Sequence, residues 1–154
     1  MSADERFVQF VKDVEPRLRR ALVGLYGPEE ARDAVAEALS YAWRHWNRVE
    51  AMANPAGYLY RVAQSRARRP RVPRVVLPAI DAATMPEVEP RLPEAMNQLS
   101  ERQRVAVLLV HGYGWSHTEA AEFLGVSVST VRNHLARGLA RLRSILEVCL
   151  DARD

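Results

Sequence analysis

The chain has 154 residues, a formal net charge of +3, 48% hydrophobic residues and 27% charged residues. This composition is typical of a soluble globular protein and excludes long intrinsic disorder. No apolar run reaches the roughly 20 residues of a membrane helix, and charged residues from Asp4 to Arg6 stand where an export signal would become apolar. We therefore expect a cytoplasmic protein that does not insert into membranes.

Helical periodicity dominates the first part of the chain. Apolar residues recur at steps of three and four from Phe7 to Leu25, which predicts a helix. Pro16 is expected to kink or divide this helix, and Gly27 to end it. Pro28 then suits the first position of a second helix. Two tryptophans at the end of its apolar stripe are interpreted as core residues: Trp43 and Trp46.

A third helix and a linker follow. Asn54 is a preferred N-cap residue and Pro55 suits the position after it, so a helix is expected to begin there. Five prolines and the lack of an apolar stripe between residues 70 and 90 predict an extended, semi-rigid linker. We therefore expect an all-α fold of two small helical domains, residues 1–69 and 92–154, joined by a proline-rich linker over 70–91.

The second half begins with two predicted helices. A short helix is expected over residues 93–99, and Ser100 is expected to cap the next one, which Gly112 and Gly114 end. Each half of the chain is small, so its core alone should be only marginally stable.

The segment from Trp115 to Arg143 carries the strongest functional signal. Ser116 and Glu119 have the spacing of a capping box, which predicts a short helix. Gly125 suits a left-handed turn, Val126 is expected to pack that turn against the core, and Ser127 is expected to cap a second helix. Two helices joined by such a turn form a helix-turn-helix, whose second helix lies in the major groove of DNA.

The second helix of this motif separates apolar from polar side chains. Its apolar face carries Val131, Leu135, Leu139 and Leu142. The opposite face carries the candidate DNA-binding residues Ser129, Thr130, Arg132, Asn133, Arg137 and Arg141. Because Arg can bond guanine and Asn can bond adenine bidentately, we expect Arg132 and Asn133 to contact base edges. Arg137 and Arg141 are expected to bind phosphates. The alternative to a DNA-binding motif is an ordinary helical hairpin with a solvated basic face.

Three stretches of the sequence resemble the extracytoplasmic-function (ECF) sigma factors of the sigma-70 family. Residues 92–143, LPEAMNQLSERQRVAVLLVHGYGWSHTEAAEFLGVSVSTVRNHLARGLARLR, resemble sigma region 4, although LuxR-type regulators share the helix-turn-helix. RDAVAEALSYAWRHW, residues 32–46, is similar to region 2.2. NPAGYLYRVAQSRAR, residues 54–68, is similar to regions 2.3 and 2.4.

The resemblance implies a protein that carries core RNA polymerase to double-stranded promoter DNA. The second domain would bind the minus 35 element, while Asp33 and Glu37 would contact polymerase. The minus 10 element would meet a set of residues on the third helix, and a loop over 49–53 would receive an extruded base. That set is Tyr58, Arg61, Ser65 and Arg68. An anti-sigma factor could clamp the two domains together.

Two departures from the family pattern keep other functions open. Ala36 stands where the family usually has Gln, and Ser65 stands where Asn is frequent. One alternative is therefore a degenerate sigma-like interaction protein. Another is a polymerase-independent helix-turn-helix regulator, because LuxR-type regulators share the helix-turn-helix. The single cysteine, Cys149, allows no internal disulfide or cysteine-based zinc site. With no phosphate loop, nucleophile motif or metal-ligand spacing, we expect no enzyme activity, cofactor or bound metal.

Overall fold

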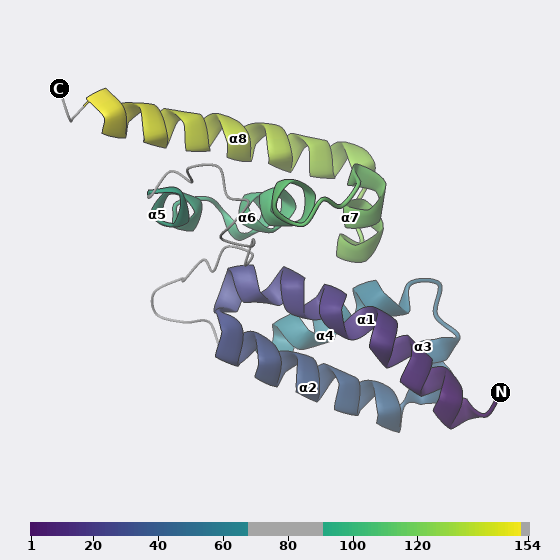
Figure 1. Ribbon diagram of the computed structural model, residues 1–154. Helices are drawn as coiled ribbons and strands as arrows, with labels where there is room; N and C mark the ends of the chain where they lie inside the picture. The colour runs from purple at the N-terminus through teal and green to yellow at the C-terminus, as the bar shows by residue number, and fades with distance from the viewer. Residues whose placement is uncertain (68–90, 152–154) are drawn as a thin grey trace, which may run out of the picture.

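The computed structural model describes residues 1–67 and 91–151, and within these ranges the regular structure is helical. The predicted linker over 70–91 lies almost wholly outside the described residues, as does Arg68. Figure 1 shows two groups of helices, one formed by α1 to α4 and the other by α5 to α8. The helices are α1 (Ala3–Tyr26), α2 (Pro28–Arg44), α3 (Trp46–Glu50), α4 (Pro55–Arg66), α5 (Leu92–Asn97), α6 (Glu101–Val107), the π-helical turn η1 (Leu108–Gly112), α7 (His117–Leu124) and α8 (Val128–Asp151).

Helix α1 runs without interruption through Pro16, so the prediction that this residue divides it is wrong. Val14 and Leu18, on either side of the proline, are both buried, and their packing holds the helix together across the lost hydrogen bond. Gly27 ends the helix as predicted, with a φ of 86° that a residue with a side chain rarely adopts.

The first group holds four helices instead of the three that the sequence predicted. The extra helix, α3, begins at Trp46, directly after α2 ends. Trp46 is 8% exposed and contacts the rings of Phe7 and Phe10, as expected for a core residue. Trp43 is 50% exposed, so the prediction that it is a core residue is wrong, although one side of its ring contacts Phe7.

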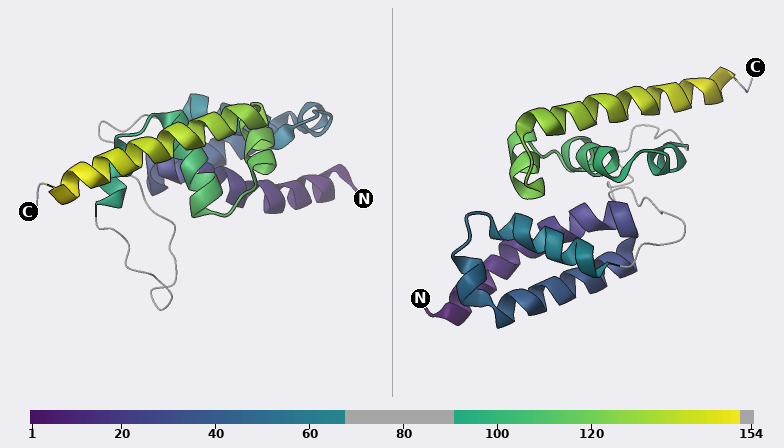
Figure 2. Two further views of the ribbon diagram at one scale, coloured as in Figure 1. Left: turned by 90° about the horizontal axis from the view of Figure 1, so that it is seen from above. Right: turned by 180° about the vertical axis from the view of Figure 1, so that it is seen from behind.

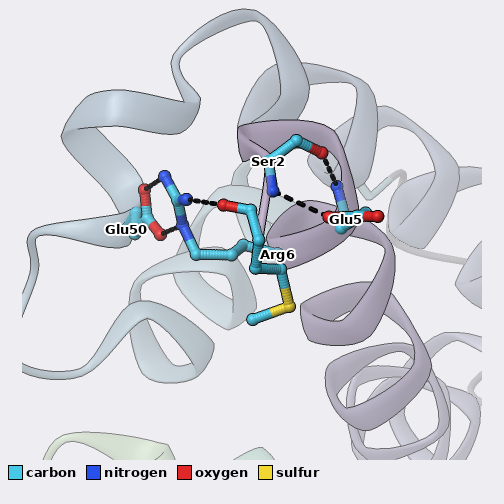
Figure 3. A network of polar contacts seen from close by, with 5 residues as sticks. Ser2, Glu5, Arg6 and Glu50 are labelled. Carbon is cyan, nitrogen blue, oxygen red and sulfur yellow. Dashed lines mark hydrogen bonds and ion pairs between the residues drawn. The ribbon is translucent and has the colours of Figure 1, made fainter.

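An ion pair ties the start of α1 to α3 (Figure 3). Arg6 donates from Nε and from Nη2 to the two carboxylate oxygens of Glu50, the second bond measuring 3.2 Å, and from Nη1 to the carbonyl of Met1. The hydrogen bond from Arg6 lowers the pKa of Glu50, and the same bond raises the pKa of Arg6. Ser2 and Glu5 form a capping box beside this pair.

The lowered pKa of Glu50 predicts an acid-sensitive contribution to stability. A carboxyl group whose pKa is lower in the folded state stabilises the fold above its unfolded pKa, near 4.5, and loses this contribution as the pH falls. We expect Glu50→Gln to reduce the free energy of unfolding at neutral pH, and this deficit to shrink below the unfolded pKa and vanish once the pH has fallen through the lower, folded pKa. Urea unfolding of both proteins across the acid range measures the deficit. A deficit that stays constant with pH would contradict the assignment.

A buried arginine joins α5 to α6 in the second group. Arg104 is 4% exposed, and its guanidinium donates to the carbonyls of Met96, Asn97 and Leu99 at 3.1 to 3.4 Å. These carbonyls lie at and just beyond the end of α5, where helix geometry leaves acceptors without a partner. Burial lowers the pKa of Arg104, and the three bonds compensate for its lost hydration.

The two groups of helices pack against each other through α1 and α4 on one side and α6, η1 and α7 on the other. The right-hand view in Figure 2, seen from behind, shows α4 facing α7, with α8 on the outer edge of the molecule. Tyr60 and Phe123 meet across this contact with ring centroids 5.1 Å apart, and Asn54 Nδ2 donates to the carbonyl of Glu122. The buried residues of both groups therefore form one continuous core.

Gly57 gives a direct test of this packing. A Cβ atom at Gly57 would lie 2.8 Å from the carbonyl oxygen of Phe123 and would also overlap the Asn54 amide. Within α4 itself alanine is favoured over glycine, so the damage falls on the contact between the groups. We expect Gly57→Ala to weaken this contact by about 1 to 3 kcal/mol. Small-angle scattering should show a radius of gyration above the roughly 15 Å of a compact chain of this length.

The matched control is Ala51→Ser, which adds one oxygen atom at an exposed position. The scattering of this control should equal that of the original chain. If Gly57→Ala is as compact as both of them, the two groups do not meet through α4 and α7.

Candidate nucleic-acid interface

Helix α7 and the turn after it form as the sequence predicted. The Ser116 hydroxyl accepts from the backbone N–H of Glu119 at 3.0 Å, and the Glu119 carboxylate accepts from the backbone N–H of Ser116 at 2.8 Å. The backbone bond lowers the pKa of Glu119. Gly125 adopts the left-handed conformation with a φ of 69°. Val126 is 40% exposed, so its predicted packing against the core is wrong, and its N–H instead holds the turn by bonding the Ala121 carbonyl.

Helix α8 is held to the protein by the apolar face that the sequence identified. Val131, Leu135 and Leu142 are buried, and Leu139 is partly buried against the core. Gly138 lets α8 approach α6 closely, since a Cβ there would lie 3.1 Å from a methyl carbon of Val107. The orientation of α8 about its axis is therefore fixed, and its opposite face turns to solvent.

The solvent face of α8 carries the six candidate DNA-binding residues, all of them exposed except Thr130, which is half-buried. Arg132, Asn133 and Arg137 make no side-chain hydrogen bond or ion pair with any described residue. They are free to bind a ligand. Ser127 caps the helix by accepting from the N–H of Thr130 at 3.1 Å, and its hydroxyl also contacts those of Ser129 and Thr130.

Arg141 differs from the other arginines of this face. Its Nε donates to the carbonyl of Gln98 at 3.4 Å, which ties the middle of α8 to the end of α5. A long bond at an exposed position costs little to exchange for another partner. Arg141 can therefore turn toward an anion without disturbing the fold.

The candidate minus 10 residues lie along α4. Arg61 and Ser65 are exposed and Tyr58 is half-buried, while Arg68 is outside the described residues. The Tyr58 hydroxyl lies 3.0 Å from that of Tyr41, and the Ser65 hydroxyl donates to the Val62 carbonyl at 2.7 Å. Tyr58 and Ser65 therefore have hydrogen-bond partners, whereas Arg61 has no hydrogen-bond or ion-pair partner among the residues that the structure describes.

The segment predicted to receive an extruded base is not a single loop. Val49 and Glu50 belong to α3, Val49 is fully buried, and Glu50 is held by Arg6. Only residues 51–53 form an open turn between α3 and α4. The prediction of a base-receiving loop over 49–53 is therefore wrong for its first two residues.

Asp33 and Glu37 are both exposed on α2, one helical turn apart. Glu37 forms an ion pair of 3.6 Å with Arg66 of α4, and both side chains are about half exposed. Such a pair contributes little to stability, so Glu37 can exchange it for another cation. Ala36, beside Glu37, is also exposed and adds no polar group to this surface.

Among the side chains that the structure describes, those of residues 1–67 and 91–147, no group of three or more from His, Cys, Asp and Glu is placed to hold a metal ion. No helix in this part of the chain has the length and apolar character needed to cross a membrane.

Known proteins are similar to this chain in sequence and in fold. Residues 90–142 match the family model described as Sigma-70, region 4. The chain is 35% identical over 161 residues to the RNA polymerase sigma-E factor of Streptomyces antibioticus, and this match covers 96% of this chain and 88% of the relative. It is 32% identical over 127 residues to the ECF RNA polymerase sigma factor SigM of Mycobacterium tuberculosis, covering 77% and 65% of the two chains. The chain belongs to the ECF sigma factors of the sigma-70 family.

Two solved structures confirm the all-α sigma-factor fold. The sigma factor RpoE in complex with the anti-sigma factor NepR from Bartonella quintana has a TM-score of 0.63 and 22% identity, covering 94% of this chain and 98% of that one. CnrH in complex with the cytosolic domain of CnrY has a TM-score of 0.61 and 25% identity, covering 94% and 90%. Because the matches extend over the first half as well, they favour a sigma factor over a polymerase-independent regulator or a degenerate interaction protein.

Proposed function

We propose that this sigma factor binds core RNA polymerase and directs it to promoters through two separate DNA-binding surfaces. The observation that carries the proposal is the solvent face of α8, where Arg132 and Asn133 are exposed and without a partner among the described residues. We assign residues 92–154 to the minus 35 element, residues 1–69 to polymerase and the minus 10 element, and residues 70–91 to the linker between them.

The minus 35 contacts follow from the geometry of α8. The N-terminal part of a recognition helix enters the major groove, and in this helix it carries Ser129, Arg132 and Asn133. Arginine bonds the two acceptors of guanine, and asparagine bonds adenine, each contact contributing about 1 to 3 kcal/mol of discrimination. Arg137 and Arg141 lie further along the same face, where they would bind phosphates and set the register of the helix.

Simultaneous contact with both promoter elements requires the two halves to separate. Elements about 25 base pairs apart are separated by roughly 85 Å of duplex at 3.4 Å per step, whereas the whole of α8 spans only about 36 Å. A proline-rich segment of about 20 residues can extend over roughly 60 Å. The packed arrangement described here is therefore the form before promoter binding, and Tyr58, Arg61, Ser65 and Arg68 would reach the minus 10 element after α4 leaves α7.

The remaining assignments concern partners and compartment. The solved sigma factor RpoE, which has this fold, is bound to the anti-sigma factor NepR, and we assign this chain an anti-sigma partner that would clamp the two halves in the packed form. The protein would act in the cytoplasm and would have no catalytic activity of its own, because binding energy alone accounts for promoter selection.

Polymerase docking through α2 tests the proposed function. We expect the chain to co-elute with purified core polymerase in size-exclusion chromatography. Asp33→Ala together with Glu37→Ala should weaken this complex about tenfold or more, because charge-assisted contacts contribute about 1.5 to 3 kcal/mol each. The control, Asp13→Ala with Glu94→Ala, removes two exposed carboxylates from other helices and should bind like the original chain. Failure of the original chain to bind core polymerase would contradict the proposal.

A further inference from the structure

A cavity of about 400 Å³ lies between the two groups of helices. Its volume is within the range of natural small-molecule sites. Helices α1 and α4 line one side of it, and α6, the end of α7 and the start of α8 line the other. It is thus a property of the packed form and exists only while the two halves are in contact.

Three basic side chains from three different helices line this cavity: Arg61 of α4, Arg102 of α6 and His134 of α8. Among the described residues, none of the three has a hydrogen-bond or ion-pair partner. The cavity also contains one carboxylate, Glu101. Burial lowers the pKa of His134, and the charges of Arg102 and Arg137 lower it further.

The rest of the lining is largely apolar. Leu25, Tyr60, Val105 and Leu124 contribute hydrophobic surface, while Gln64 and Thr130 add neutral polar groups. An apolar wall beside a few convergent polar groups is the usual composition of a ligand site, in which the wall supplies burial and the polar groups fix orientation. A ligand that fits needs an apolar body and an acidic group.

We propose that this cavity binds a small amphipathic anion. Its acidic group would lie among Arg61, Arg102 and His134, and its apolar body would lie against Leu25 and Val105. Because residues of both halves would contact the ligand, binding stabilises the packed form against the open form that promoter binding requires. Binding itself needs neither polymerase nor DNA, so it can be tested independently of the proposed function.

Anilinonaphthalene sulfonate is a suitable probe, because it joins aromatic rings to one permanent negative charge. Phenylnaphthylamine has the same rings without the sulfonate. We expect the sulfonate to bind the full chain at one saturable site in a fluorescence titration, and the neutral compound to bind at least about tenfold more weakly, as for the loss of one charge-assisted contact. Equal affinities for the two compounds would overturn the proposed anion site.

Two variants locate the binding site. Arg102→Gln together with His134→Gln should raise the dissociation constant of the sulfonate about tenfold or more, whereas Arg19→Gln with His45→Gln removes the same residue types at exposed positions outside the cavity and should change nothing. Circular dichroism checks that each variant is folded. Gly57→Ala, which retains every lining residue but weakens the contact between the halves, should also bind more weakly. Unchanged binding by either the Arg102 and His134 variant or Gly57→Ala would place the probe elsewhere and overturn the proposal.

Discussion

Replacing Arg132 and Asn133 together with alanine is expected to abolish promoter-specific transcription by the holoenzyme. Both side chains are exposed and form no hydrogen bond or ion pair with a described residue, so we expect their loss to leave the fold intact. If each makes one bidentate base contact, the pair contributes about 2 to 6 kcal/mol of discrimination, which corresponds to a loss of roughly 30-fold to 20,000-fold. Run-off transcription from a promoter selected by the original protein measures this loss.

A matched variant separates base contacts from a general loss of polar groups. Gln9→Ala with Arg19→Ala removes one amide and one guanidinium from exposed positions on α1, away from both DNA-binding surfaces. Its transcription should remain within about twofold of the original level, since surface substitutions away from special features change free energies by less than about 0.5 kcal/mol. If the α8 variant performs as well as this control, Arg132 and Asn133 do not contact bases.

The largest loss of stability is expected from Phe123→Ala. Phe123 is fully buried, its ring contacts those of Tyr60 and Trp115 at 5.1 and 5.2 Å, and the Arg17 guanidinium lies 5.2 Å from its centroid. Truncating a buried phenylalanine costs about 3 to 5 kcal/mol, a large share of the roughly 5 to 15 kcal/mol that stabilises a typical domain. Urea unfolding followed by circular dichroism should show a much lower midpoint or no folded state at all.

Val126→Ala is the control for this substitution, because Val126 is a nearby apolar residue that is 40% exposed. It should change the free energy of unfolding by less than about 0.5 kcal/mol. A loss below about 1 kcal/mol for Phe123→Ala would show that this ring does not anchor the contact between α7 and the first half.

The helix-turn-helix could be predicted because its signals are local. Ser100, Ser116 and Ser127 each accept from a backbone N–H three residues on, and such caps depend only on neighbouring residues. The exposure of Arg132 and Asn133 likewise follows from their places between Val131 and Leu135 on a helix whose apolar face is buried. Spacing alone therefore predicted which face of α8 is exposed to solvent.

Other features depend on contacts that leave no pattern in the sequence. Asn54 bonds the backbone carbonyl of Glu122, 68 residues away, and a carbonyl acceptor is the same whatever the residue type. The sequence would place an arginine such as Arg104 at the surface. It is buried because its three acceptors are backbone carbonyls, which no residue pattern reveals. Pro16 is a strong local signal for a helix break, but the packing of its buried neighbours keeps the helix continuous.

Run-off transcription on a pool of genomic fragments shows whether this chain gives core RNA polymerase a promoter specificity of its own. With core polymerase and the full-length chain, we expect discrete new transcripts whose start sites share a minus 35 and a minus 10 element. Core polymerase alone should not produce them. If adding the chain produces no transcript beyond those of core polymerase at any fragment of the pool, the chain does not direct promoter-specific initiation.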